Sequence, residues 1–319
     1  MNFQNIPPVE NSKYFLDLAF SKAREKGKSK NLKGNWLQII RIKESLKLDI
    51  IKDTIVPRLE KILHTFPGTA DLPQFYIKLI RLTLDYSQLK KSFGAVNWAI
   101  KRIRSLQKEY VGNITRTKER DKIKDLSKQF YGRVSSTLKQ IDPNLKYLEE
   151  SRKIMKNYPD IKEMFTVCIY GFPNVGKTTL LNKLTKTKAK TAEYAFTTIS
   201  INAGYIAKDN IKVQVLDVPG TLARKEKMNI IELQAELVMT DLANLIIYVF
   251  DLSGHGGYSI REQEQLLKEL NQLGLKDKIL IYVSKTDLPE GKPKEDFKHK
   301  YHSLEELKEK VIKSATRNN

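Results

Sequence analysis

Apolar residues recur every three or four positions through the first half of the chain, a spacing that places them on one face of a helix. The clearest stripe consists of Ile123, Leu126, Phe130, Val134, Leu138 and Ile141. Such a stripe needs an apolar partner, and the connections between the expected helices are short. We therefore predict an antiparallel helical bundle over residues 1–160.

Proline, glycine and capping residues set the expected ends of these helices. The expected starting residues are Ser12, Asn35, Pro73 and Pro143. The expected ends are Gly27, Gly94 and Gly112-Asn113. A kink or break is expected at Pro57, a separate fourth helix around Ile100–Tyr110, and the domain boundary at Tyr158-Pro159.

In the second half, residues 161–319, short apolar runs of strand length alternate with helical stretches. These runs cover residues 164–170, 199–206, 211–216 and 278–283. The alternation favours a mostly parallel sheet flanked by helices, so the predicted fold class is α + α/β. Only 15 residues separate Asp287 from Ser303, where the final helix is expected to begin. A full helix and a sixth strand hardly fit there.

A glycine-rich loop with the spacing G-x-x-x-x-G-K-T follows the first of these runs. Between a strand and a helix, such a loop turns backbone N–H groups toward phosphate oxygens, and the helix N-terminus adds positive potential. We expect Lys177 to reach the β- and γ-phosphates and the Thr178 hydroxyl to hold Mg²⁺. The predicted nucleotide-binding residues here are Gly171, Phe172, Pro173, Asn174, Val175, Gly176, Lys177, Thr178 and Thr179.

The tetrapeptide Ser284-Lys285-Thr286-Asp287 indicates the base. The Asp287 carboxylate can accept hydrogen bonds from guanine N1–H and the exocyclic amine, which adenine does not offer. Lys285 would lie along the base plane. Ser284 stands where GTPases usually have Asn, and its shorter side chain can still hydrogen-bond the phosphate loop. We predict a GTP/GDP site here, with a solvated turn as the alternative. The usual Ser-Ala-Lys loop is not recognisable, and Tyr301-His-Ser303 is its candidate replacement.

Two further segments supply candidates for the metal and the γ-phosphate. Asp217 ends a predicted strand and could hold Mg²⁺ through water, and the Gly220 N–H could sense the γ-phosphate. Thr198 is the predicted second Mg²⁺ hydroxyl, with Thr197 as the alternative, and either could be an ordinary loop residue. The expected catalytic residues are Lys177, Thr198, Gly220 and Asn174.

The whole chain has a formal net charge of +20, and most of this positive charge lies in its first half. Residues 1–160 hold 33 Lys and Arg against 17 Asp and Glu, whereas residues 161–319 hold 24 against 20. Such an excess of positive charge favours a polyanionic partner. The expected partner is folded RNA, recognised by its shape and phosphate backbone and not by its bases. For any single row of cations, a solvated helix face is an equal alternative. The candidate contacts are Lys101, Arg104 and Lys108 in one row and Arg116, Arg120, Lys124 and Lys128 in a second, expected along one helix.

The remaining features of the sequence concern location. No stretch of about 18 uncharged apolar residues occurs, so no membrane span or membrane partner is expected. The first 15 residues lack the pattern of a signal peptide. The single cysteine, Cys168, lies in a predicted strand and excludes a disulfide within the monomer. These features lead us to expect a cytoplasmic protein.

The motifs GFPNVGKT, YAFTT and DVPG resemble those of Obg-related GTPases of the translation-factor type. The segments 229–235 (NIIELQA), 248–253 (YVFDLS) and 261–263 (REQ) are similar to the nucleolar GTP-binding protein family, in its short archaeal-type form. The resemblance covers nearly the whole chain. It implies a helical domain before a GTPase domain and a role in assembling the large ribosomal subunit, with its precursor RNA as partner.

The expected reaction is attack of water on the γ-phosphate of GTP, with Lys177, Mg²⁺ and loop amides stabilising the charge. Thr221 and Leu222 follow Gly220 where Ras-like enzymes carry a Gln, so slow intrinsic hydrolysis is expected. A ribosomal partner or a potassium ion would accelerate it. Asn174 matches the loop Asn that helps hold potassium in related GTPases, and a local turn is the equal alternative.

Three alternatives to this function stay open at this point. One is a regulatory GTPase whose helical domain binds a protein partner. The others are an ATP-using enzyme and an RNA-binding protein with an inactive nucleotide site.

Overall fold

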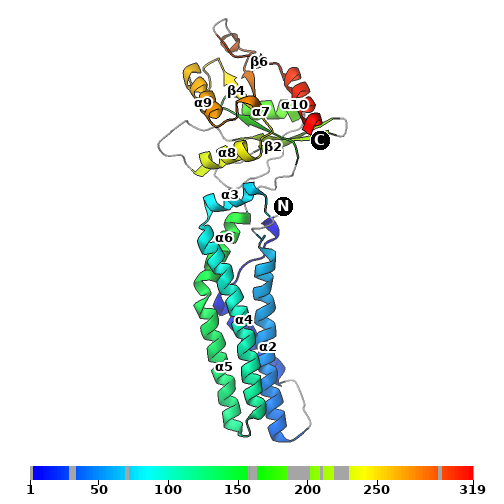
Figure 1. The fold of residues 1–319 in the computed structure, drawn as a ribbon, viewed down its shortest axis with the longest axis vertical. Helices are drawn as coiled ribbons and strands as arrows, with labels where there is room; N and C mark the ends of the chain where they lie inside the picture. The colour runs from blue at the N-terminus through cyan, green and yellow to red at the C-terminus, as the bar shows by residue number, and fades with distance from the viewer. Residues whose placement is uncertain are drawn as a thin grey trace. The chain divides into compact units, whose positions relative to one another are not determined.

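A computed structural model of the chain describes residues 3–28, 34–68, 72–156, 158, 164–185, 202–208, 211–218, 230–293 and 297–318. The chain divides into two compact units (Figure 1). The helical unit comprises Phe3–Asp71 and Leu84–Lys156. The sheet unit comprises Met1–Asn2, Leu72–Thr83 and Asn157–Asn319. The grouping of Leu72–Thr83 with the sheet was not indicated by the sequence.

The helical unit is a bundle built around α4, which packs against α2, α5 and α6, while α1 packs along α2 (Figure 1). Its elements are η1 (Phe3–Asn5), α1 (Ser12–Lys28), α2 (Trp36–Thr65), α4 (Tyr86–Arg116), α5 (Arg120–Gln140) and α6 (Asp142–Lys156). The predicted apolar stripe lies on α5, and its Phe130, Val134 and Leu138 are fully buried. The predicted bundle is therefore confirmed, and apolar burial along this stripe is what holds it together.

The break considered at Pro57 is absent, and the helix ends predicted at Gly94 and Gly112-Asn113 are wrong. The helix α2 begins after Asn35, whose side chain accepts a hydrogen bond from the Leu37 N–H at 3.2 Å, as expected of a cap. It does not break at Pro57 but continues to Thr65. A proline costs about 3 kcal/mol inside a helix. Burial of neighbours such as Ile55 and Leu59, at about 1.5–3 kcal/mol each, outweighs that cost.

The predicted helix from Pro73 to Gly94 is two helices. The first, α3 (Gln74–Thr83), ends early, and Asp85 caps α4 by accepting from the Gln88 N–H at 3.0 Å. The helix α4 then runs through Gly94 and through Gly112-Asn113. A glycine costs only about 1 kcal/mol in a helix, so a continuous buried face along α4 overrides both.

The sheet unit contains a six-stranded sheet in the order β2-β3-β1-β4-β5-β6. The strand β2 is antiparallel to β3, and the other neighbours are parallel. A mostly parallel sheet with flanking helices was predicted, and this is confirmed. Besides α3, the elements are β1 (Thr166–Tyr170), α7 (Lys177–Thr185), β2 (Asn202–Lys208), β3 (Ile211–Asp217), α8 (Ile230–Asp241), β4 (Leu245–Asp251), α9 (Ile260–Gln272), η2 (Lys276–Lys278), β5 (Ile279–Ser284), η3 (Pro289–Gly291), β6 (Tyr301–His302) and α10 (Leu304–Asn318).

A sixth strand is present, contrary to the prediction from the short spacing after Asp287. It fits because β6 has only two residues and a single short turn, η3, stands where a full helix was considered. His302 pairs with Tyr282 of β5. Ser303 caps α10, with its hydroxyl accepting from the Glu306 N–H at 3.2 Å, so this helix begins where it was expected.

Candidate functional site

Four of the parallel strands, β1, β3, β4 and β5, end at the same edge of the sheet, and each of these ends carries a polar feature. The glycine-rich loop follows β1. Asp217 ends β3, Asp251 ends β4 and Ser284 ends β5. In open sheets of this kind, ligands bind at the carboxyl ends of the strands. Distant parts of the sequence therefore meet at one site.

Three backbone positions shape the glycine-rich loop. Gly171 has φ 148°, and a Cβ there would lie 2.8 Å from the Val249 carbonyl oxygen. Asn174 and Gly176 have φ values of 61° and 93°. The left-handed backbone of Asn174 is the local-turn role foreseen for it, and its role toward potassium stays a prediction. Along the loop, Phe172 and Val175 are buried, Pro173 is half-buried, and Asn174, Thr178 and Thr179 are exposed.

Lys177 is the first residue of α7 and is buried, with 8% of its surface exposed. Its ammonium donates to the carbonyl oxygens of Gly171 at 3.1 Å and Phe172 at 2.7 Å. Burial lowers the pKa of Lys177 from 10.5 to about 8, although the nearby Asp217 charge opposes the shift. The ammonium therefore lies over the loop, where phosphate oxygens of a ligand can replace the two carbonyl oxygens as its hydrogen-bond acceptors.

Two of the three predicted metal ligands lie together. The Thr178 hydroxyl donates to Asp217 Oδ2 at 2.5 Å, and the Asn202 amide donates to the same oxygen at 3.3 Å. A hydroxyl and a carboxylate are hard oxygen ligands of the kind that Mg²⁺ prefers, so these residues fit that ion. The third predicted ligand, Thr198, and the predicted γ-phosphate sensor, Gly220, lie outside the described residues.

The segment predicted to read the base, residues 284–287, is joined to the glycine-rich loop by a hydrogen bond. The Ser284 hydroxyl lies 2.6 Å from the Val175 carbonyl oxygen and 3.0 Å from that of Phe250, and it can donate to either. The predicted hydrogen bond to the loop is thus confirmed, despite the shorter side chain. Lys285 takes a left-handed backbone with φ 54°, and Asp287 is exposed. This exposure leaves the Asp287 carboxylate free to meet a base.

The segment Tyr301-His302-Ser303, the candidate replacement for the Ser-Ala-Lys loop, has one exposed and one buried aromatic side chain. Ser303 caps α10, and Tyr301 is 47% exposed. His302 is buried, with its imidazole 3.1 Å from the Lys310 ammonium. Burial and the Lys310 charge lower the pKa of His302, although the Glu306 carboxylate opposes the shift. Whether this segment backs a guanine ring stays a prediction.

Sequence reasoning missed two residues beside the site. The Asp251 carboxylate accepts a hydrogen bond from the Lys285 ammonium at 2.6 Å. The Gln263 side chain on α9 holds the Asp251 backbone, accepting from its N–H and donating to its carbonyl, both at 2.8 Å. Both residues lie in segments that resemble the family, 248–253 and 261–263, and Asp251 is also an acidic residue that ends an apolar run. No sequence pattern signalled that Gln263 would contact Asp251.

The packing of α3 was also missed. This helix lies against α8 within the sheet unit, and the Lys78 ammonium pairs with the Asp241 carboxylate at 2.8 Å. Its apolar residues Phe75, Tyr76, Leu79 and Ile80 are buried. In the sequence, α3 reads as one more helix of the bundle, because its apolar face does not say which partner will cover it.

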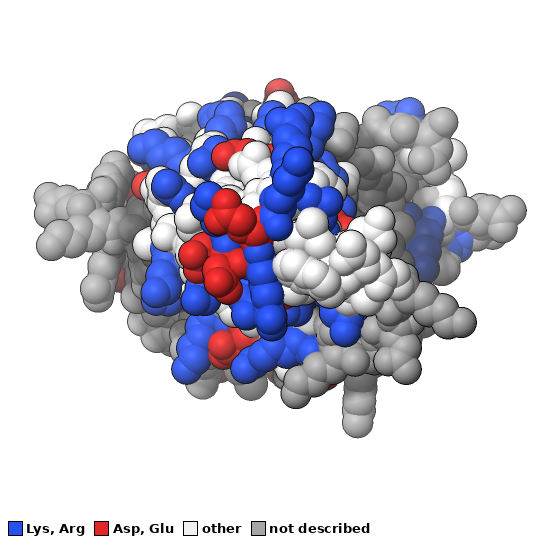
Figure 2. Space-filling view, turned by 90° about the horizontal axis from the view of Figure 1, so that it is seen from below, with Lys and Arg blue, Asp and Glu red and all other residues white. Residues whose placement is uncertain are grey.

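The seven predicted RNA contacts are all exposed. Within the described part of the chain, Arg104 pairs with Glu60 at 2.6 Å and Lys128 with Asp125 at 3.8 Å, whereas the other five have no carboxylate partner. The second row does not run along one helix, because Arg116 ends α4 and the chain turns before α5 begins at Arg120. Figure 2 shows Lys and Arg side chains spread over this end of the bundle around a smaller acidic group.

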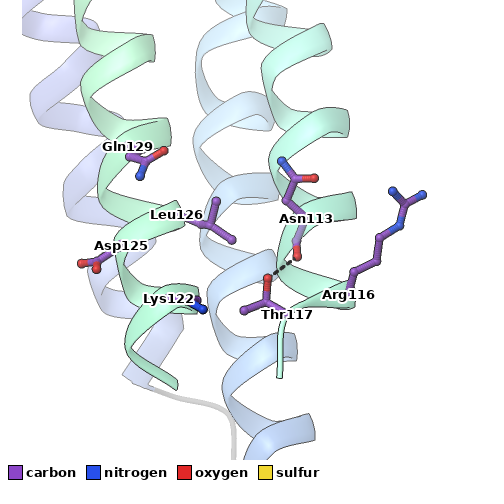
Figure 3. A pocket seen from close by; sticks show the side chains of 7 residues that line it. All are labelled: Asn113, Arg116, Thr117, Lys122, Asp125, Leu126 and Gln129. Carbon is purple, nitrogen blue, oxygen red and sulfur yellow. Dashed lines mark hydrogen bonds between the residues drawn. The ribbon is translucent and has the colours of Figure 1, made fainter. Parts of the chain in front are cut away.

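An open cleft of about 470 Å³ lies between α4 and α5 at this end (Figure 3). Its residues combine charged, amide and apolar side chains: Asn113, Arg116, Thr117, Lys122, Asp125, Leu126 and Gln129. The Arg41 guanidinium on α2 holds the α4–α5 turn by donating to the Thr117 carbonyl at 2.8 Å. The turn that carries part of the basic surface is therefore anchored to a third helix.

Comparison with known proteins assigns both halves of the chain. Residues 3–162 match the NOG1 N-terminal helical domain, and residues 166–285 match the family described as 50S ribosome-binding GTPase. An uncharacterized protein of Methanocaldococcus jannaschii is 39% identical over 79% of this chain and 71% of its own length. Nucleolar GTP-binding protein 1 of Drosophila melanogaster is 31% identical over 92% of this chain and 46% of its own length.

Among solved structures, the FeoB G-domain from Methanococcus jannaschii is 20% identical, with a TM-score of 0.38, over 49% of this chain and 99% of its own. The chain spans about half the length of the nucleolar GTP-binding relatives that it matches. Among the helices in the described part of the chain, none has the length and hydropathy of a membrane span.

Proposed function

The chain belongs to the nucleolar GTP-binding protein family, in which a NOG1 N-terminal helical domain precedes a GTPase domain, and from this membership we propose a role in large ribosomal subunit assembly. GTP binding and hydrolysis by residues 161–319 would act as the switch. The basic helical part, residues 1–160, would dock on the precursor RNA of that subunit, in the cytoplasm. The observation that carries the nucleotide chemistry is the meeting of Thr178 and Asp217 at the N-terminus of α7.

In the proposed site, Lys177 exchanges its two carbonyl partners for the β- and γ-phosphates of GTP. Thr178 and Asp217 would hold Mg²⁺, with Thr198 as the proposed further ligand, and the ion would neutralise charge on the phosphate oxygens. The loop amides and the start of α7 add fixed positive potential. Thr221 and Leu222, which follow Gly220, have no side-chain amide to orient the attacking water. Slow hydrolysis follows, accelerated by the ribosomal partner or by a potassium ion held with the help of Asn174.

Two variants test the nucleotide site. Lys177→Ala should abolish GTP binding, because the loop then lacks the ammonium that compensates the phosphate charge; unchanged binding in a competition assay would rule out this site. Asp287→Asn should shift preference from guanosine to xanthosine nucleotides, since the new amide donates a hydrogen bond where xanthine accepts one. Competition by ATP that equals competition by GTP would instead indicate an ATP-using enzyme.

The support for RNA docking is the exposed charge along α4 and the start of α5. Lys101, Lys108, Arg116, Arg120 and Lys124 lack carboxylate partners among the described residues, so no ion pair must break before they meet phosphate. The neighbouring cleft could take an unstacked base, with Leu126 beneath it and the amides of Asn113 and Gln129 at its edges. Phosphate contacts would supply affinity, and the cleft would supply local fit.

The test is co-sedimentation of the full chain with large ribosomal subunits at rising salt. Replacing Arg120, Lys124 and Lys128 by Gln should reduce the slope of log affinity against log salt by about one per lost contact. The matched control replaces Lys313 and Arg317, which are exposed on α10 in the sheet unit. An association whose affinity does not change with salt concentration, or no association, would favour the regulatory GTPase with a protein partner.

A further inference from the structure

Asp251 ends β4 as a buried carboxylate, with 1% of its surface exposed. Four donors surround it. Its Oδ1 accepts from the Ser253 N–H at 3.0 Å and the Ser253 hydroxyl at 2.5 Å. Its Oδ2 accepts from the Gly256 N–H at 2.9 Å and the Lys285 ammonium at 2.6 Å. A buried charge with this many partners is compensated and holds them in one geometry.

The carboxylate is ionised at neutral pH. Burial acts to raise the pKa of Asp251, but hydrogen bonds from Lys285 and Ser253 outweigh it and leave the pKa below its ordinary value. The partner ammonium is itself partly buried, with 24% of the Lys285 side chain exposed. Removing the negative charge would therefore leave a cation without its counter-ion.

On one side, this network holds the turn that carries Asp287. Lys285 has a left-handed backbone, and its carbonyl accepts from the Leu288 N–H at 3.1 Å, closing a turn that carries Asp287. Gly291 packs against the same carbonyl so closely that a Cβ there would lie 2.0 Å from its oxygen. Lys285 is thus held at its ammonium by Asp251 and at its carbonyl by the turn, which fixes where the exposed Asp287 stands.

The other side of the network lies beside the glycine-rich loop. A Cβ on Gly256 would lie 2.9 Å from Asp251 Oδ2 and 3.7 Å from the Asn174 carbonyl oxygen, so only a residue without a side chain leaves room at this position between Asp251 and the loop. Two residues along, the Tyr258 ring stacks on Phe172, with centroids 4.2 Å apart and planes at 21°. Asp251 therefore links the turn that carries Asp287 to the segment packed beside the glycine-rich loop.

We propose that Asp251 is a positioning residue for guanine recognition: through Lys285 and Gly256 it sets the separation between Asp287 and the glycine-rich loop. Base and phosphates of one nucleotide can then be bound at once. The inference rests on the guanine-nucleotide site proposed above. It makes Asp251 a determinant of base selectivity, although the carboxylate need not touch the nucleotide.

The experiment compares GDP with IDP, whose base lacks the exocyclic amine that Asp287 would read. In Asp251→Asn, which keeps the size of the side chain and removes its charge, the preference for GDP over IDP should fall about tenfold. Ser253→Ala, which removes one hydrogen-bond donor and leaves the Asp251 carboxylate, should also lower the preference for GDP over IDP, by a smaller factor. The control is Asp277→Asn, an exposed acidic residue before the opposite end of β5.

The readout separates positioning from a general structural role. A variant that is merely less stable would lose GDP and IDP affinity equally and would melt at a lower temperature. An unchanged GDP-to-IDP ratio in folded Asp251→Asn would overturn the proposal while leaving the nucleotide site intact. If Asp251→Asn does not fold, an unchanged ratio in Ser253→Ala would overturn it. Failure of the unmodified chain to bind GDP would overturn both the site and the proposal.

Discussion

Nucleotide binding should place a proton on Lys177. In the free protein, burial holds the pKa of this ammonium at about 8, so at pH 8 about half of the molecules carry a neutral Lys177. The phosphates of a bound nucleotide favour the ammonium and raise its pKa. At pH 8, binding should therefore take up about 0.5 proton per nucleotide, and at pH 7 about 0.1, since there most molecules are already protonated.

The sign of the pH dependence follows from the same shift. The pKa of Lys177 is higher in the bound state than in the free state. Affinity should therefore be fully present below pH 8 and should weaken as pH rises through the free-state value. The loss should approach tenfold per pH unit until the bound-state pKa is reached. Each unit corresponds to about 1.4 kcal/mol of interaction between the ammonium and the phosphates.

Calorimetric titration with GDP and Mg²⁺ measures this uptake directly. The apparent enthalpy at pH 8 is compared in two buffers with different ionisation enthalpies, and the slope gives the number of protons. The matched control is Lys183→Gln, an exposed lysine on the same helix, which should leave the uptake unchanged. Tight binding with no proton uptake at pH 8 would show that Lys177 is already charged, and the reasoning from its burial would be refuted.

Three further substitutions test the site and the core. Ser284→Ala removes the donor to the Val175 carbonyl and should speed GDP dissociation about tenfold in stopped-flow fluorescence; an unchanged rate would show that the contact is dispensable. Gly171→Ala would place a Cβ 2.8 Å from the Val249 oxygen, so GDP affinity should drop sharply while the chain stays folded, and normal affinity would contradict the tight packing of the loop. Phe130→Ala should lower the free energy of unfolding by about 3–5 kcal/mol in urea denaturation, whereas Lys124→Ala on the exposed face of the same helix should change it little.

Some features could be predicted because local sequence determines them. The α5 stripe needs only helical periodicity, and the cap at Asn35 needs only its own side chain and the next turn of backbone. The glycine-rich loop is similar, since its spacing and its flanking strand and helix specify a phosphate-binding geometry on their own. The helices continue through Pro57, where a kink or break was expected, and through Gly94, where an end was expected. Burial of apolar faces against other helices outweighs the local cost of a few kcal/mol at these residues.

Local patterns in the chain are enough to predict a helical bundle before a mostly parallel sheet, and to single out Lys177, Thr178, Asp217 and Asp287 as candidates for the nucleotide site. The packing of α3 on α8 and the contact between Asp251 and Lys285 depend instead on how the chain folds in three dimensions. Asp251 and Lys285 are far apart in the chain and meet because β4 and β5 are parallel neighbours, ending in register at Asp251 and Ser284. Contacts of that kind depend on which strands become adjacent, and no local pattern of residues encodes that choice.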